Sequence, residues 1–160
     1  MGTFEIRIAK KGDEVLIVAL LRELAEYEKL LDRFHITPDI VARDYLGEHP
    51  LMSCDLAFED EKPAGIATWF WTYGSFAAAR KIFLSDLFVR PQFRGKHYGR
   101  ALLANLAKRV LAHGGVGVDW DVLDWNKPSI DFYDGIGATP NTGWLAYGIA
   151  GDALTRLARS

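Results

Sequence analysis

Basic side chains and glycines gather in one short stretch of the chain, between residues 84 and 100. An apolar, aromatic-rich segment ends at Pro91, a turn follows, and apolar residues at helical spacing begin directly after it. The start of a helix offers unpaired N–H groups and partial positive charge, and glycine lets the backbone approach a phosphate closely. The stretch predicts a pyrophosphate site made by Arg94, Gly95, Lys96, His97, Tyr98, Gly99 and Arg100.

The turn lacks two common nucleotide-binding patterns, Gly-x-x-x-x-Gly-Lys-Ser/Thr and Gly-x-Gly-x-x-Gly. The alternative interpretation is a plain entry into a helix with a solvated basic rim.

A second group of polar residues opens a helix predicted over 126–135. Asn126 is a natural N-cap, and Pro128 suits the first turn. Asn126, Ser129 and Tyr133 are spaced i, i+3 and i+7, so they share one face of that helix. Each also has a purely structural explanation: a cap, a solvated hydroxyl and a ring packed on the sheet.

Composition limits the class of protein. The 160 residues, of which 49% are hydrophobic, suit one domain over residues 1–160. The net charge of −2 argues against nucleic-acid binding. Cys54 is the only cysteine and the four histidines lack ligand spacing, so we expect no disulfide and no metal. The N-terminus lacks a signal-peptide core and no apolar run is long enough to span a membrane, so we expect a cytoplasmic protein.

Hydrophobic periodicity and turn residues predict one α+β domain with a mixed sheet. Strands are expected over 4–8, 51–59, 64–73, 81–89, 116–123 and 144–149, the last of which would close the sheet. Helices are expected over 13–31, 37–47, 98–113 and 126–135, with a final turn or two over 152–158. Asp13 is expected to cap the first helix.

The two motifs together resemble a known family. The run Arg94-x-x-His97-x-Gly99 is similar to Gln/Arg-x-x-Gly-x-Gly/Ala of the GCN5-related N-acetyltransferases, and Asn126-x-x-Ser129-x-x-x-Tyr133 follows at the expected separation. His97 replaces the central glycine, although histidine tolerates a positive φ better than most residues. Segments 22–29, 47–54, 123–126 and 143–154 resemble the diamine acetyltransferase branch, so the likeness covers nearly the whole chain.

The resemblance implies a mostly antiparallel mixed sheet of about six to seven strands with about four helices. It implies acetyl-CoA as donor, direct attack by the amine in a ternary complex, and a homodimer. In that scheme Tyr133 protonates the leaving thiolate as general acid. The cofactor contacts would come from 94–100 for the pyrophosphate, from Leu87, Phe88 and Val89 for the pantetheine arm, and from Asn126 and Ser129.

An amine acceptor is a cation at neutral pH, since its pKa is about 10.4, and it needs carboxylates. Candidates are Glu28 (with Tyr27 beside it), Asp86, Asp119 and Asp121. Asp119 and Asp121 are two apart and would face one side of a strand. The alternatives are that this face is exposed or that the pair meets a Lys or Arg in the fold.

Two departures bear on the acceptor. The polyamine enzymes carry Leu-Glu-Asp where this chain has Leu84-Ser85-Asp86, so Asp86, or water leading to the other aspartates, must accept the proton in place of Ser85. The family's Thr-Tyr-Asp-Pro-Trp becomes Thr72-Tyr73-Gly74-Ser75-Phe76, which removes a carboxylate and favours an acceptor less cationic than spermine. The alternatives are a non-catalytic acyl-CoA-binding regulatory module and an acetyltransferase for protein lysines or N-termini.

Overall fold

The computed structural model describes residues 2–160, which fall into two compact units, the first ending at Trp125 and the second beginning at Asn126. The first unit holds one sheet with the strand order β1-β2-β3-β4-β5. Neighbouring strands are antiparallel except β4 and β5, which are parallel, so the predicted mixed sheet is confirmed. The strands are β1 (Phe4–Ile8), β2 (Ser53–Glu59), β3 (Lys62–Gly74), β4 (Ala79–Val89) and β5 (Gly117–Trp120).

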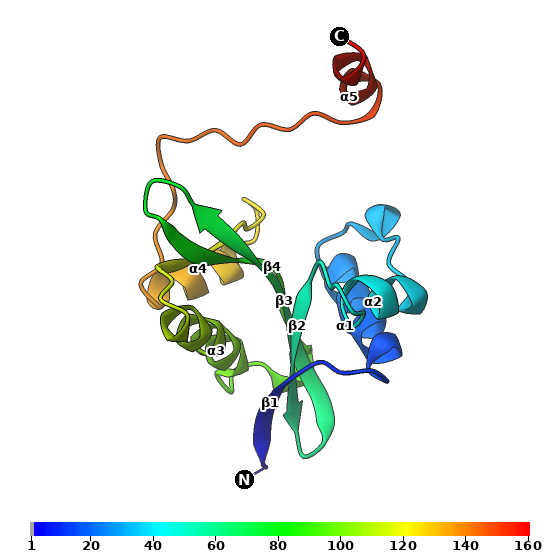
Figure 1. The fold of residues 1–160 in the computed structure, drawn as a ribbon. Helices are drawn as coiled ribbons and strands as arrows, with labels where there is room; N and C mark the ends of the chain where they lie inside the picture. The colour runs from blue at the N-terminus through cyan, green and yellow to red at the C-terminus, as the bar shows by residue number, and fades with distance from the viewer. Residues whose placement is uncertain (1) are drawn as a thin grey trace. The chain divides into compact units, whose positions relative to one another are not determined.

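Helices cover both faces of this sheet. As Figure 1 shows, α1 and α2 lie on one side of the strands and α3 lies on the other. Short 3-10 turns, η1 (Leu31–Arg33) and η2 (Pro91–Phe93), follow α1 and β4. The helices of this unit are α1 (Glu14–Tyr27), α2 (Pro38–Asp44) and α3 (Tyr98–Ala112).

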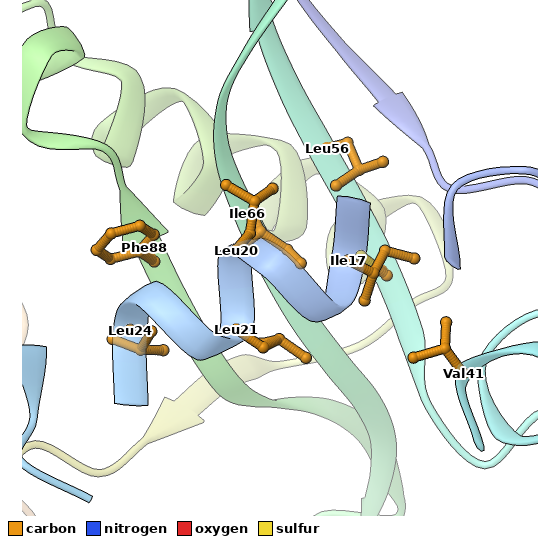
Figure 2. Close-up of a cluster of buried hydrophobic side chains, with 9 residues drawn as sticks. Ile17, Leu20, Leu21, Leu24, Val41, Leu56, Ile66 and Phe88 are labelled. Atoms are coloured by element: carbon orange, nitrogen blue, oxygen red, sulfur yellow. The ribbon is translucent and has the colours of Figure 1, made fainter. Parts of the chain in front are cut away.

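The core on the α1 side follows from helical spacing. Ile17, Leu20, Leu21 and Leu24 recur on one face of α1 and are buried. They pack against side chains of β2, β3 and β4, as Figure 2 shows. Each fully buried aliphatic side chain contributes roughly 1.5–3 kcal/mol. The sheet residues of this cluster are Cys54, Leu56, Ile66 and Phe88, and Val41 joins it from α2.

The first helix is shorter than expected. It ends at Tyr27, and Lys29 adopts a φ of 61°, which a helix cannot continue. Asp13 does occupy the N-cap position, but its side chain makes no cap hydrogen bond. Instead its carboxylate accepts two hydrogen bonds from Arg7, at 2.8 and 2.9 Å. The ion pair is the stronger partner for this carboxylate, so Asp13 stands at the predicted N-cap position without the side-chain cap.

The opposite face of the sheet is organised by a buried aspartate. Asp55 on β2 is 0% exposed. Arg109 of α3 donates to both of its oxygens, at 2.7 and 3.1 Å, and Trp69 and Asn105 also donate to it. Buried charge is tolerated only when it is paired and hydrogen-bonded, and here both carboxylate oxygens accept hydrogen bonds from Arg109 itself. The network ties α3 to β2 and β3.

The second unit contains α4 (Lys127–Gly135) and α5 (Gly151–Ala158), and residues 139–150 between them form neither helix nor strand. The strand predicted over 144–149 is therefore wrong. An alternation of apolar and polar residues predicts a strand only if another part of the protein covers its apolar face, and the pattern alone does not show that such a surface exists. Trp144 and Tyr147 are 83% and 90% exposed.

The described residues thus give five strands and five α-helices, one strand fewer than the lower expected number. Among residues 2–160, no helix has both the length and the apolar character needed to cross a bilayer.

The Asp55 network yields a stability prediction. Arg109→Ala leaves Asp55 with a buried charge that has lost its cation, and we expect a loss of about 3–5 kcal/mol in the free energy of unfolding. Arg43→Ala breaks an ion pair whose arginine is 72% exposed, and we expect a much smaller loss because solvent screens the pair. Urea denaturation of the two variants measures both. Equal losses would contradict the role given to Asp55.

Candidate active site

The register of β3 and β4 decides which face Asp86 occupies. Thr68 lies opposite Asp86, whereas Trp69 lies opposite Leu84, so Ser85 is an extra residue in β4. Such a bulge re-aims the residues on either side of it. Without it, Leu84 and Asp86 would share a face. With it, Leu84 joins Trp69 on the α3 face and Asp86 turns towards α1 and α2.

Asp86 completes a row of side chains across three strands. Cys54 pairs with Thr68 and Thr68 pairs with Asp86, next to the apolar row that Leu56, Ile66 and Phe88 form in the core cluster. The Thr68 hydroxyl donates to an Asp86 carboxylate oxygen at 2.5 Å. Burial raises the pKa of Asp86, although hydrogen bonds from Thr68 and Ser85 oppose that rise. Asp86 is therefore a desolvated carboxylate stabilised by neutral donors.

Glu28 brings a second carboxylate to the same place. It follows Leu24 by four positions and so continues the buried face of α1. Burial raises the pKa of Glu28, and the charge of Asp86 raises it further. Within residues 2–160 no cation forms an ion pair with either carboxylate, in contrast to Asp55. Two partly desolvated carboxylates close together favour a bound cation or a shared proton.

The predicted pyrophosphate turn has the geometry of an anion site. His97 has a φ of 64° and precedes α3, and Gly95 has a φ of 76°. The first helical hydrogen bond runs from Ala101 N–H to His97 C=O, and no side chain caps the helix. The N–H groups of the first turn, from Tyr98, Gly99 and Arg100, are thus available to phosphate oxygens. Phosphate groups fit this turn.

Some of the basic side chains of that turn are already engaged. Glu59 at the end of β2 accepts hydrogen bonds from Lys96, at 2.8 and 2.9 Å, and from the Tyr98 hydroxyl. These bonds lower the pKa of Glu59, and the same contact raises the pKa of Tyr98 to about 12. Arg94 donates to Val89 C=O at 2.9 Å, and Arg100 is exposed.

Beyond Leu84, no strand among the described residues pairs with β4 on its β5 side. The pairing with β5 covers only Lys81 to Leu84, although β4 continues to Val89. Arg90 N–H donates to Ala64 C=O on the other side. Since N–H directions alternate along a strand, those of Leu87 and Val89 point away from β3. They are open to an extended ligand, whereas the Phe88 side chain packs in the core.

The remaining predicted carboxylates are differently placed. Asp119 lies on β5 and pairs with Lys81 at 2.6 Å, which is one of the alternatives the sequence left open. Asp121 lies beyond the end of β5 and is exposed, so the two do not share a strand face. Tyr27 is 37% exposed, and its ring lies 6.4 Å from that of Trp125.

The last three predicted residues belong to the second unit. Asn126 caps α4 as expected, because its side-chain oxygen accepts the Ser129 N–H at 3.4 Å. Tyr133 lies on α4, partly buried, with its ring 5.3 Å from that of Phe132.

Thr68 and Glu59 are site residues that sequence analysis did not single out. The signal for Thr68 was a lone hydroxyl in the otherwise apolar run 64–71. The sequence holds no signal for Glu59, because Lys96 and Tyr98, which it contacts, lie 37 and 39 positions further along the chain. Within residues 2–160 no group of three or more His, Cys, Asp or Glu side chains is arranged to hold a metal ion.

Comparison with known proteins agrees with this geometry. The chain belongs to the acetyltransferase (GNAT) family, whose profile matches residues 17–138. It is 34% identical to a thialysine N-epsilon-acetyltransferase of Sus scrofa and 35% identical to that of Bos taurus, with 99% of each chain covered. An integron cassette protein from V. cholerae has a solved structure with a TM-score of 0.83, 27% identity and 98% coverage of both chains. The protein is an N-acetyltransferase, in a family that uses acetyl-CoA.

The raised pKa of Asp86 yields a second prediction. The folded protein binds this proton more tightly than the unfolded chain does, so ionisation of Asp86 costs stability as the pH rises through the folded-state pKa. Asp86→Asn keeps an acceptor for Thr68 and removes the charge. We expect Asp86→Asn to have a higher Tm than the wild type at pH 7, by about 3 °C for each kcal/mol gained in the free energy of unfolding. The difference in Tm should shrink towards pH ~4, where the wild-type carboxyl is also protonated.

Differential scanning calorimetry at several pH values measures this difference, and exposed Asp32→Asn is the control. A Tm that falls at pH 7 in Asp86→Asn would show that the charge stabilises the fold.

Proposed function

We propose that this N-acetyltransferase, acting as one domain over residues 1–160, transfers the acetyl group of acetyl-CoA to the primary amine of a small cationic acceptor. The acceptor class is a diamine, a polyamine or a lysine analogue, and the amine attacks the thioester directly in a ternary complex. The relatives named for thialysine support a small amine.

The observation that carries the proposal is the pair Glu28 and Asp86. Both carboxylates are desolvated, the charge of Asp86 adds to the cost of charging Glu28, and no cation of the described residues forms an ion pair with either. An acceptor ammonium supplies the missing charge and recovers part of the desolvation cost. The same pair gives an acceptor amine a route to lose its proton.

The donor is assigned to the open side of β4 and the turn before α3. Leu87 and Val89 N–H groups pair with the amides of the pantetheine arm, and the first turn of α3 holds the pyrophosphate with Arg94, Lys96 and Arg100. When the donor binds, the Lys96 ammonium leaves the Glu59 carboxylate and bonds to phosphate oxygens instead. For Asn126 and Ser129 on α4, contact with the donor is proposed from the family resemblance alone.

The chemical step forms an N–C bond and breaks the C–S bond. Asp86 accepts the proton that the amine loses, since Ser85 has no basic group, and its raised pKa suits that role. Tyr133 gives a proton to the coenzyme A thiolate. The proposed homodimer would use the exposed aromatic tip of the β3–β4 hairpin, where Tyr73 and Phe76 are 65% and 108% exposed.

The test is release of free thiol from acetyl-CoA with 1,3-diaminopropane, spermidine, lysine, thialysine and a lysine peptide. We expect turnover with a small amine and a loss of about 100-fold or more in kcat for Tyr133→Phe. Acetyl-CoA binding without thiol release would instead favour a regulatory module, and activity on the peptide alone would favour a protein acetyltransferase.

A matched pair of variants tests the carboxylates. Glu28→Gln removes a charge from the buried face of α1, and we expect KM for a diamine to rise about tenfold, the scale of one desolvated ion pair. Glu26→Gln alters an exposed position of the same helix and should leave KM unchanged. An equal response in both variants would remove Glu28 from the acceptor site.

A further inference from the structure

The three side chains of the row Cys54–Thr68–Asp86 differ in their exposure to solvent. Thr68 is 0% exposed and Cys54 is 2% exposed, whereas Asp86 keeps partial exposure. An acceptor can therefore reach the Asp86 end of the row, next to Glu28. The Cys54 end is covered by other side chains of the protein.

Tyr45 lies beside this row, close enough to both Asp86 and Cys54 for their charges to act on its phenol. It ends α2, with its N–H on Val41 C=O, and its ring packs against the core cluster that includes Cys54, Leu56 and Phe88. The backbone holds this corner in place, because Asp44 C=O accepts both Leu51 and Met52 N–H, at 2.8 and 3.1 Å, just before β2 begins.

The electrostatics agree with that position. Burial raises the pKa of the Tyr45 phenol, and the charges of Asp86 and Cys54 raise it further. The phenol is therefore neutral at working pH and can donate a hydrogen bond, but it offers no charge for a second ammonium. Among residues 2–160 no side chain is hydrogen-bonded to its hydroxyl.

We propose that Tyr45 determines acceptor length: its ring closes the site beyond Asp86, so short amines are preferred over long polyamines. This inference rests on the proposed function. A long acceptor would have to place methylenes and a second ammonium where the ring lies, against the neutral Thr68 and Cys54. Tyr45 acts by touching the substrate's far end and takes no part in the proton transfer.

The test compares kcat/KM for spermidine and for 1,3-diaminopropane. In Tyr45→Ala the ratio of the two should rise about tenfold or more, the scale on which a pocket discriminates one or a few methylenes. Tyr45→Phe keeps the ring and should leave the ratio unchanged. Tyr147→Ala, at a tyrosine that is 90% exposed and has no proposed role, is the matched control and should also leave the ratio unchanged.

A second readout does not depend on activity. Cys54 is the only cysteine, and burial raises the pKa of its thiol. Removal of the Tyr45 ring should expose this thiol and speed its reaction with a disulfide reagent. If Tyr45→Ala does not fold, Tyr45→Leu, which is shorter but still apolar, takes its place.

The outcomes separate the two proposals. No turnover of any small amine by the wild-type protein would overturn the proposed function itself. Turnover by the wild type, with an unchanged acceptor ratio in a folded Tyr45→Ala or Tyr45→Leu variant, would overturn the role of Tyr45 alone. Unchanged Cys54 reactivity in that variant would show that the ring does not cover the row.

Discussion

The β-bulge at Ser85 is the constraint on which the site depends. It separates Leu84 and Asp86, which strict alternation would put on one face, and sends them to opposite sides of the sheet. Leu84 goes to the α3 side, and Asp86 is set under α1 beside Glu28. After the bulge, the N–H groups of Leu87 and Val89 point to the side that β5 has left. One extra residue therefore positions both the carboxylate proposed to receive the acceptor and the strand segment proposed to bind acetyl-CoA.

Asp55 on β2 and Asp86 on β4, which β3 separates in the sheet, show how a structural carboxylate differs from a proposed functional one. Asp55 meets an arginine, an indole and an amide, and this closed network stabilises the packing of α3. Asp86 meets only hydroxyl groups, so its charge is not balanced. A carboxylate in that state destabilises the fold and binds cations or protons more readily. The same residue type thus supports the scaffold on one face and the proposed chemistry on the other.

Local patterns predicted most of the first unit and the start of α4. The spacing of Leu20 and Leu24, the glycine turn before α3 and the Asn126 cap are each set by neighbours in sequence, so they could be predicted. The pairing of Asp119 with Lys81 is set by strand register, and that of Glu59 with Lys96 by the position of the turn before α3 relative to β2; no local pattern encodes either. Tyr45 was overlooked for the same reason, because its position relative to Asp86 exists only once α2 packs on the sheet. The strand predicted over 144–149 failed for a related reason: its alternating pattern implies a surface that covers its apolar side, and local sequence does not show whether one exists.

The most direct measurement is a carbon-13 NMR titration of the Asp86 carboxyl group, assigned by its loss in Asp86→Asn, with coenzyme A present and a short diamine absent or added. The account predicts a pKa above the ordinary aspartate value in the absence of the diamine, and a clear fall when the ammonium binds. An ordinary pKa that the diamine does not change would contradict the central claim that Asp86 is an unbalanced, desolvated carboxylate that receives the acceptor.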